Sequence, residues 1–338
     1  MTFKIYLMNV KKVIIILIFL TIFFTEGFTQ VTSTYNFLRL DVDAKSSAMA
    51  GTYVAAINDV NTIFYNPAGL ATLKSNQASV GFFKYLMDIN SGNASISKKY
   101  KDIGYFGVGI RFINYGSFDK YDEFDNNLGT FSATDIALSL GYANKYNPYD
   151  FVTDDSLTKD ISLNYGINLK FIYSHIDEYN SSALALDAGL IYHIPKYMVS
   201  VGASILNAGF QLDPYYNTKE NLPIDLRIGV SKQLEDIPLT VNLSFSNLLE
   251  KQDKFFKRFR NVSIGGDFQI YDYVHLRLGY NNQQRQDLKT GSTIGLAGFS
   301  AGFGFVYEDK YILDYSYNSM GKIGSTHRIN VAVRMLDF

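Results

Sequence analysis

Apolar and polar side chains alternate one for one along most of this chain, and residues 162–174 give the clearest example. Apolar side chains there are Leu163, Tyr165, Ile167, Leu169, Phe171 and Tyr173, separated by Ser162, Asn164, Gly166, Asn168 and Lys170. A strand points successive side chains to opposite faces, so one face is apolar across a membrane's thickness while the other is polar. The alternation returns at residues 224–231 and 274–281. This repetition favours a membrane β-barrel over a soluble β-sandwich.

From Gln77 onward the pattern predicts fourteen strands, the even number that single-chain bacterial barrels have. Their cores lie at 77–86, 90–98, 103–113, 132–145, 161–174, 182–193, 198–207, 223–233, 238–248, 261–270, 273–282, 293–306, 311–318 and 326–335. The fold class we predict is therefore all-β, a fourteen-stranded antiparallel transmembrane β-barrel covering residues 77–338.

The connections between the predicted strands have unequal lengths. Those after odd-numbered strands from the third onward are mostly long and polar, as at 114–131 and 208–222. Those after the sixth, eighth, tenth and twelfth strands are short, so we expect the long loops to face the outside of the cell. Segment 146–160 is long where a short periplasmic turn is expected, and it suits a cap on the periplasmic mouth or a partner-binding segment.

Both ends of the chain carry features of exported barrels. Residues 1–30 have the pattern of a secretory signal peptide, in which lysines precede the apolar run 13–24 and small or polar residues follow. No other stretch approaches about 18 apolar residues, so a spanning helix is not supported. The final amphipathic strand and Phe338 resemble the signal for outer-membrane insertion. We therefore expect an exported protein of the cell outer membrane.

Residues 31–76 lack the pattern of a spanning strand. The segment is rich in alanine and interrupted by glycine and proline, which predicts short helices and turns. Asn66 and Pro67 start a turn, because an Asn side chain can bond the backbone ahead of it while Pro fixes φ. We expect this segment to form a helical or looped hatch inside the barrel.

The hatch carries motifs that are specific enough to compare with a family. The motifs are YNFLRL at 35–40, DAKSSAMAG at 43–51 and NDVNTIFYNPAGLA at 58–71. They resemble the opening of the PorV/PorQ proteins, relatives of the FadL fatty-acid transporter. The likeness continues through GFFKYLMDINSG at 81–92, FINYGSFDKYDEF at 112–124, LGTFSATDIALSLGYA at 128–143 and LKFIYSHIDEYNS at 169–181, and leans toward PorQ.

The resemblance implies a fourteen-stranded barrel whose hatch ends in an Asn-Pro-Ala turn, here Asn66, Pro67 and Ala68. It also implies an outer-membrane component of the type IX secretion system of Bacteroidota. Lys45 stands where the family usually has Arg, and Ala50-Gly51 where it often has Gly-Gly. These departures weaken the assignment to one subfamily and leave the expected fold intact.

Composition narrows the function classes. With a net charge of -1 the chain has no basic excess for nucleic acid. Its 26 Tyr and 26 Phe suit aromatic rings at both membrane interfaces. Cysteine is absent, so disulfides and thiolate metal sites are excluded.

The predicted polar faces hold charges of both signs in near balance. They are Arg111, Lys170, Arg227, Arg277, Arg328 and Arg334, with Asp135, Asp187, Asp225, Asp267 and Asp314. This balance argues against an ion-selective pore. Buried charges need partners, so we expect a lumen-facing network that pairs across the lumen or with the hatch.

Other candidate chemistry is weak. Residues 298–302 match the G-x-S-x-G nucleophile motif but are followed by a strand pattern instead of a helix. The four histidines lie in different strands without zinc-like spacing. We predict no catalytic residue, metal or cofactor. The basic aromatic run 254–260 suits either contact with lipopolysaccharide or a partner, or a solvated loop tip.

The sequence therefore predicts a non-catalytic barrel that sits among outer-membrane lipids and lipopolysaccharide. The long loops and the family resemblance together imply that it docks proteins of the secretion and surface-attachment machinery. The alternative is a FadL-like transporter that moves hydrophobic small molecules through the barrel and beside the hatch. A continuous apolar tunnel would distinguish the two, and the polar lumen rows count modestly against the transporter.

Overall fold

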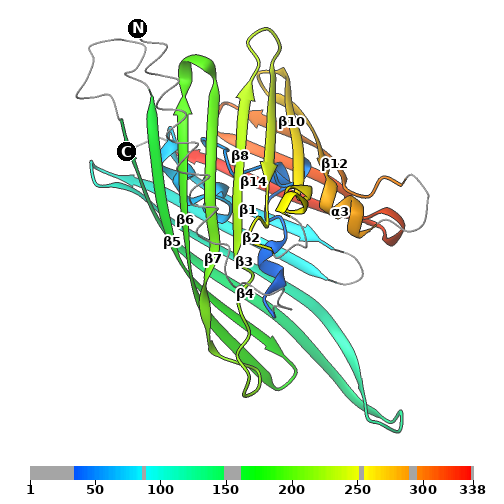
Figure 1. Cartoon of the computed structure of the whole chain (residues 1–338). Helices are drawn as coiled ribbons and strands as arrows, with labels where there is room; N and C mark the ends of the chain where they lie inside the picture. Colours follow the sequence, from blue (N-terminus) through cyan, green and yellow to red (C-terminus); the bar gives the residue numbers. More distant parts are fainter. Residues whose placement is uncertain (1–33, 86–88, 148–160, 251–254, 289–294, 336–338) are drawn as a thin grey trace.

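The computed structural model describes residues 34–85, 89–147, 161–250, 255–288 and 295–335. The predicted signal peptide, most of segment 146–160 and Phe338 lie outside these residues. Within them, the chain forms a closed antiparallel barrel around a group of short helices (Figure 1).

The barrel has the predicted fourteen strands, and β1 pairs with β14 to close it. The strands are β1 (Asn76–Lys84), β2 (Asn90–Tyr100), β3 (Gly104–Tyr121), β4 (Asn127–Tyr146), β5 (Ser162–Ile176), β6 (Tyr179–Ile194), β7 (Val199–Asp213), β8 (Asp225–Gln233), β9 (Leu239–Phe245), β10 (Val262–Tyr271), β11 (Val274–Asn281), β12 (Phe299–Tyr307), β13 (Tyr311–Ser319) and β14 (Ser325–Met335). Each strand pairs with its sequence neighbours, so the predicted fold class is confirmed.

The two faces of the wall differ as the alternation predicts. On β5 the outward side chains Ile167 and Leu169 are exposed, whereas the inward Asn168 and Lys170 are buried. Exposed apolar side chains recur on the outer face of the other strands, and buried polar side chains recur inside. An apolar exterior around a polar interior is the arrangement of a transmembrane barrel.

The wall is much taller on one side than on the other. Strands β3 to β7 have 15 to 20 residues, whereas the remaining strands have 7 to 11. The extra length projects past the rim that carries the connections after odd-numbered strands, which we call the outer rim. The opposite rim, where β1 begins and β14 ends, we call the inner rim.

The prediction of a long loop at 114–131 is wrong. This segment continues β3 and β4 as a hairpin with a turn at residues 122–126, and the connection after β5 is only residues 177–178. Beyond the rim both faces of a strand meet water, so most of the apolar alternation that marks a spanning strand is lost. Segment 208–222 is divided similarly, because β7 continues to Asp213.

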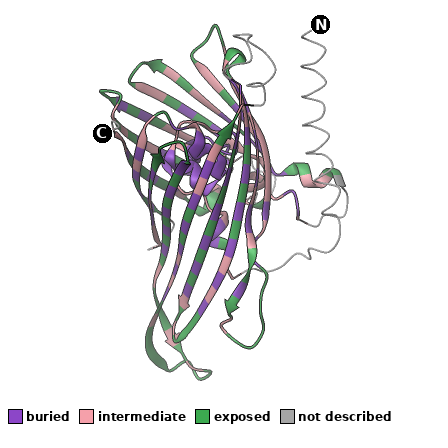
Figure 2. Cartoon of the chain, turned by 90° about the vertical axis from the view of Figure 1, so that its left-hand side faces the viewer, coloured by how far each residue is buried: buried purple, intermediate pink, exposed green. Residues whose placement is uncertain are grey.

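The hatch precedes β1 and consists of η1 (Asn36–Arg39), α2 (Ala44–Ala48), η2 (Val60–Phe64) and η3 (Pro67–Thr72). Asp43, Asp59 and Asn66 cap the last three helices by accepting backbone N–H bonds. Figure 2 shows these buried helices inside the barrel. None of the described helices combines the length and apolar character needed to span a membrane.

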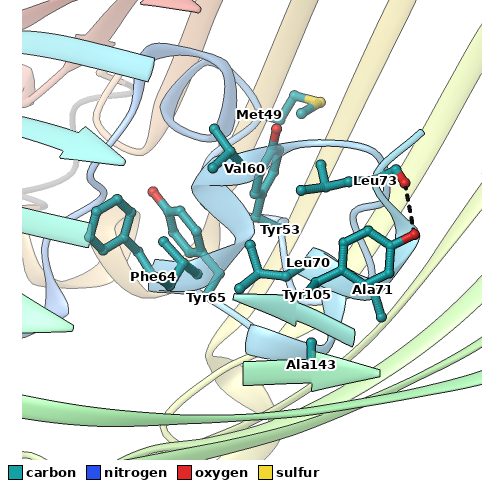
Figure 3. Close-up of a cluster of buried hydrophobic side chains, with 11 residues drawn as sticks. Met49, Tyr53, Val60, Phe64, Tyr65, Leu70, Ala71, Leu73, Tyr105 and Ala143 are labelled. Carbon is teal, nitrogen blue, oxygen red and sulfur yellow. Dashed lines mark hydrogen bonds between the residues drawn. The ribbon is translucent and has the colours of Figure 1, made fainter. Parts of the chain in front are cut away.

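The hatch has a hydrophobic core of its own that reaches the wall. Figure 3 shows Tyr53, Tyr65 and Leu70 in this core beside Tyr105 of β3. The Tyr105 hydroxyl donates to the Leu73 carbonyl at 3.3 Å. The remaining described helices, η4 (Pro195–Tyr197), η5 (Phe255–Arg260), α3 (Asn282–Asp287) and η6 (Gly321–Ile323), lie in connections between strands.

Candidate functional site

The Asn66 side chain joins the hatch to the wall. Its Oδ1 accepts from Ala68 N at 3.1 Å, which caps η3, and Pro67 occupies the first helical position. Its Nδ2 donates to Val54 O at 2.7 Å within the hatch and to Leu190 O at 3.1 Å on β6. Asn66 is fully buried, so these bonds satisfy groups that would otherwise be left without water.

Glycines in the wall give the hatch turn the room it needs. A Cβ at Gly166 of β5 would lie 2.5 Å from the Pro67 carbonyl carbon, and one at Gly189 of β6 would overlap Asn66 Oδ1. Other inward glycines also face hatch atoms, namely Gly107, Gly109, Gly202, Gly229, Gly265, Gly279 and Gly302. The hatch therefore approaches the wall at backbone distance on several sides.

Arg111 of β3 binds the hatch through backbone oxygens. Its guanidinium donates to the carbonyls of Phe37, Leu38 and Leu40, with the Leu38 bond at 3.2 Å, and lies 5.2 Å from the centre of the Phe37 ring. These carbonyls lie in the last turn of η1 and at its C-cap Leu40, where helix carbonyls outnumber the local donors. A buried cation from the wall thus holds the first helix of the hatch.

The other predicted lumen charges form separate groups between neighbouring strands. Lys170 pairs with Asp187 at 2.9 Å and donates to Asn207 Oδ1 at 2.6 Å. Arg277 joins Asp267 at 3.2 Å and Asp314 at 2.6 Å.

The remaining predicted lumen charges contact one another or nearby polar and aromatic groups. Arg227 pairs with Asp225 at 2.5 Å. Arg328 donates to Asn318 at 2.9 Å and its guanidinium carbon lies 3.7 Å from the centre of the Phe83 ring. Asp135 accepts from the hydroxyls of Tyr115, at 2.7 Å, and Ser174. Half-exposed Arg334 donates to Asp309 O near the inner rim at 3.2 Å.

An apolar cluster in the outer half of the lumen was not predicted. Tyr35, Phe37 and Leu38 of the hatch pack against inward residues of the tall wall. The wall residues are Ile113, Ala137, Ile172, Ala183 and Ala185, joined by Leu222 from the connection after β7. The sequence signal is the set of alanines and isoleucines on inward rows that are otherwise polar. Within this cluster, alanine and isoleucine side chains of the wall pack around η1.

Cavities open on both sides of the hatch. A cavity of about 350 Å³ faces the outer rim, and its lining includes Asp41, Arg227 and Arg328. Cavities of about 370 Å³ and 550 Å³ face the inner rim and share Lys74 and His193. The hatch separates these spaces, and all three are lined by polar and apolar atoms in similar proportion.

Burial also changes the chemistry of the hatch itself. Asp43 caps α2 by accepting from Ser46 N at 2.6 Å, and it is almost completely buried. Burial, followed by the charge of Asp59, raises the pKa of Asp43 to about 7. This carboxyl of the hatch therefore keeps its proton to higher pH than an ordinary aspartate does.

The weaker motifs take structural positions. Ser300 lies within β12, and its hydroxyl donates to Ala48 O of the hatch at 3.0 Å. Histidines 175, 193, 275 and 327 bond to separate partners. Among the described residues no three His, Cys, Asp or Glu side chains form a group that could hold a metal ion. Lys254 of the basic run lies outside the described residues, and Phe256 is exposed on η5.

Comparison with known proteins identifies the fold. Neither protein-family models nor curated proteins match this chain. Solved structures do: the TodX monoaromatic hydrocarbon channel, as a deltaS2 mutant, aligns with a TM-score of 0.55 at 14% identity over 86% of this chain and 97% of that chain.

Two further structures align over 87% of this chain and 98% of their own. The Ralstonia pickettii toluene transporter TbuX gives a TM-score of 0.51 at 12% identity, and a Pseudomonas aeruginosa FadL homologue gives 0.51 at 10%. The chain therefore shares the barrel fold of these three proteins.

Proposed function

We propose that this barrel binds a small hydrophobic molecule and passes it across the outer membrane, without catalysis. The observation that carries the proposal is the apolar cluster in the outer half of the lumen, where Phe37 and Leu38 occupy an apolar pocket between alanine and isoleucine side chains of the wall. The hydrocarbon channel and the toluene transporter of the same fold support an apolar ligand of similar size. A ligand of this kind gains free energy by leaving water for that pocket.

Entry of the ligand requires η1 to move. The pocket is filled by η1, whose carbonyls are held by Arg111. A ligand that displaces Phe37 and Leu38 makes the apolar contacts that these side chains give up, so the burial of the ligand offsets the burial that they lose. Passage to the inner rim then requires a rearrangement of the hatch, since the hatch separates the cavities on its two sides.

The chain has no tryptophan, so a single introduced tryptophan reports on the pocket without background. With Leu38→Trp, we expect toluene to shift the emission to longer wavelength, because the ring leaves the apolar pocket for water. Val80→Trp, on the lipid-facing side, serves as the matched control. A saturable shift at position 38 alone supports the proposal. Equal, unsaturable responses at both positions would mean that toluene only partitions into detergent or lipid.

A second candidate function is docking in a secretion machinery, as the PorV/PorQ resemblance implies. The specific support is that the hatch is bonded to the wall through buried polar side chains, while strands β3 to β7 project past the outer rim. Under this proposal the partners are attachment-complex proteins of a type IX secretion system in Bacteroidota, with lipopolysaccharide around the barrel. Helix η5 carries three basic residues, of which Arg260 is exposed, and this suits contact with that anionic layer.

Affinity purification from the native outer membrane separates the two candidates. Docking would be favoured if secretion proteins co-purify with the barrel and if deletion of its gene leaves the rate of hydrocarbon uptake unaltered. Recovery of the barrel alone, together with uptake that depends on the gene, would favour transport.

A further inference from the structure

The hairpin of β3 and β4 extends past every neighbouring strand. We call residues 117–132 the outer ribbon; it comprises the ends of β3 and β4 and the turn between them. β4 pairs with β5 only as far as Ala133 opposite Ile176. Figure 1 shows the hairpin extending by itself at the lower right. The ribbon is therefore a two-stranded projection on the outer side of the barrel.

The outward side chains show where the membrane band ends on these strands. Phe112 pairs with Ile136, which pairs with Tyr173, and this row is apolar. The next row toward the outer rim is Asn114, Thr134 and His175, which is polar. The outer ribbon begins beyond that row, so it stands in water, outside the lipid.

The tip of the ribbon is held in one conformation. Asp122 Oδ1 accepts from Phe124 N at 2.8 Å and from Asn126 N at 2.9 Å, and its Oδ2 accepts from Asn126 Nδ2 at 2.9 Å. The Asp122 backbone N–H donates to Asn126 O at 3.1 Å. This turn presents the Phe124 side chain with 76% of it exposed. A preorganised tip loses little entropy when it binds.

Large apolar side chains gather on the ribbon although it stands in water. Tyr121 and Leu128 are more than half exposed, and Phe118, stacked on Phe131 with ring centres 5.3 Å apart, is 42% exposed. Exposed apolar patches of this kind mark interaction sites. Rigid aromatic side chains that enter a pocket are typical anchors of protein interfaces.

The same region is strongly acidic. Six carboxylates stand at the tips of the β3–β4 and β5–β6 hairpins, against the single cation Lys120, which pairs with Asp177. They are Asp119, Asp122, Glu123, Asp125, Asp177 and Glu178. An anionic lipid or polysaccharide surface would be repelled, whereas a basic protein surface would be attracted.

We propose that the outer ribbon is a docking knob for a protein partner that presents an apolar pocket for Phe124 within a rim of lysine or arginine side chains. The knob does not depend on ligand binding in the lumen. The knob rests on the second candidate function, docking, and adds to it the surface that docks and the chemistry of the partner.

Photo-crosslinking in native cells tests the knob. A photoreactive phenylalanine analogue replaces Phe124 in the test protein. In the matched control it replaces Phe256, an equally exposed phenylalanine in another outer-rim connection. We expect position 124 to form one protein adduct, mapped to a surface with lysine or arginine around apolar residues. The adduct yield should fall at least tenfold with Glu123→Gln and Asp125→Asn together, which leave the Asp122 turn in place.

A reciprocal charge exchange distinguishes a specific partner from a chance neighbour. Glu123→Lys should abolish the adduct, and changing the mapped partner lysine to glutamate should restore it. Heat-modifiable migration in gels confirms that each variant is folded. Adducts with lipopolysaccharide or lipid alone, no adduct, or the same adducts at positions 124 and 256 would overturn the knob. Secretion proteins that still co-purify in that case would leave the docking candidate standing through another surface.

Discussion

At the scale of single residues, Asn66 has the largest role in placing the hatch. It caps η3 and donates to carbonyls of both the hatch and β6. The turn itself follows from Asn and Pro in sequence. The contacts with the wall could not be predicted, because Leu190 is more than a hundred residues away and its register depends on the closed barrel.

Replacing Asn66 separates its two roles. Asn66→Ala should destabilise the hatch by about 1–3 kcal/mol, because it removes the cap and leaves buried carbonyls without donors. Asn66→Asp, the matched variant, keeps the acceptor for Ala68 N and loses the donors. Limited proteolysis of the hatch, with barrel folding followed by gel migration, measures the effect. Equal protease resistance in wild type and Asn66→Ala would contradict this role.

Asp43 gives the hatch a dependence on pH. Its folded pKa is raised to about 7 from the ordinary value of 3.8, so the folded hatch binds more protons than the unfolded one between these values. Stability contributed by this group is therefore present at pH 4 and is lost as pH rises toward 7. Each pKa unit corresponds to about 1.4 kcal/mol, so the loss is a few kcal/mol at most.

The test compares cleavage of the hatch at pH 5 and pH 8 by a protease of pH-independent activity, with an unfolded reference peptide for normalisation. We expect faster cleavage at pH 8 in wild type and a much smaller difference in Asp43→Asn, which is neutral at both values. A pH effect of the same size in Asp43→Asn would show that another group is responsible.

At the scale of elements, the period-two alternation was sufficient to place the strands because lipid and lumen impose opposite requirements on alternate side chains. The outward row Phe112, Ile136 and Tyr173 illustrates how uniform that requirement is across neighbouring strands. This requirement ends where the strands leave the membrane. The sequence pattern therefore predicts a loop at the residues that form the outer ribbon. The apolar pocket was missed for a related reason, since alanines such as Ala183 and Ala185 on inward rows carry little signal.

The outer ribbon depends on few tertiary contacts. An isolated two-stranded hairpin is marginally stable in water, so the stacked Phe118 and Phe131 rings should matter to it. Phe118→Ser should speed amide hydrogen exchange across residues 117–131 at least tenfold while the exchange of β5 stays unchanged. Ser117→Ala, one residue away and exposed, is the control. If residues 117–131 exchange at the same rate in wild type, Phe118→Ser and Ser117→Ala, the ring pair does not stabilise the ribbon.

At the scale of the whole molecule, the barrel is closed and its interior is occupied by its own N-terminal segment. The fold could be predicted because alternation, strand number and the hatch motifs all indicated the same architecture. The pairing of lumen charges could not, since sequence shows which side chains point inward but not which of them meet. Arg111 is buried on the inner face of β3, and its partners there are backbone carbonyls of Phe37, Leu38 and Leu40.

Under the proposed function, a hydrophobic molecule can pass through the barrel only after the hatch moves. Because the chain has no cysteine, a cysteine pair at Asn61 of η2 and Ser95 of β2 can be oxidised to a disulfide without competing thiols. The Ser95 hydroxyl donates to Asn61 Oδ1 at 2.8 Å, so the two positions face each other between hatch and wall. The measurement is the entry rate of labelled toluene into cells carrying the Asn61→Cys, Ser95→Cys barrel, before and after reduction. We predict that entry in the oxidised state falls to the rate of cells lacking the protein and recovers on reduction. Undiminished entry with the disulfide formed would show that toluene does not pass through the barrel by movement of the hatch.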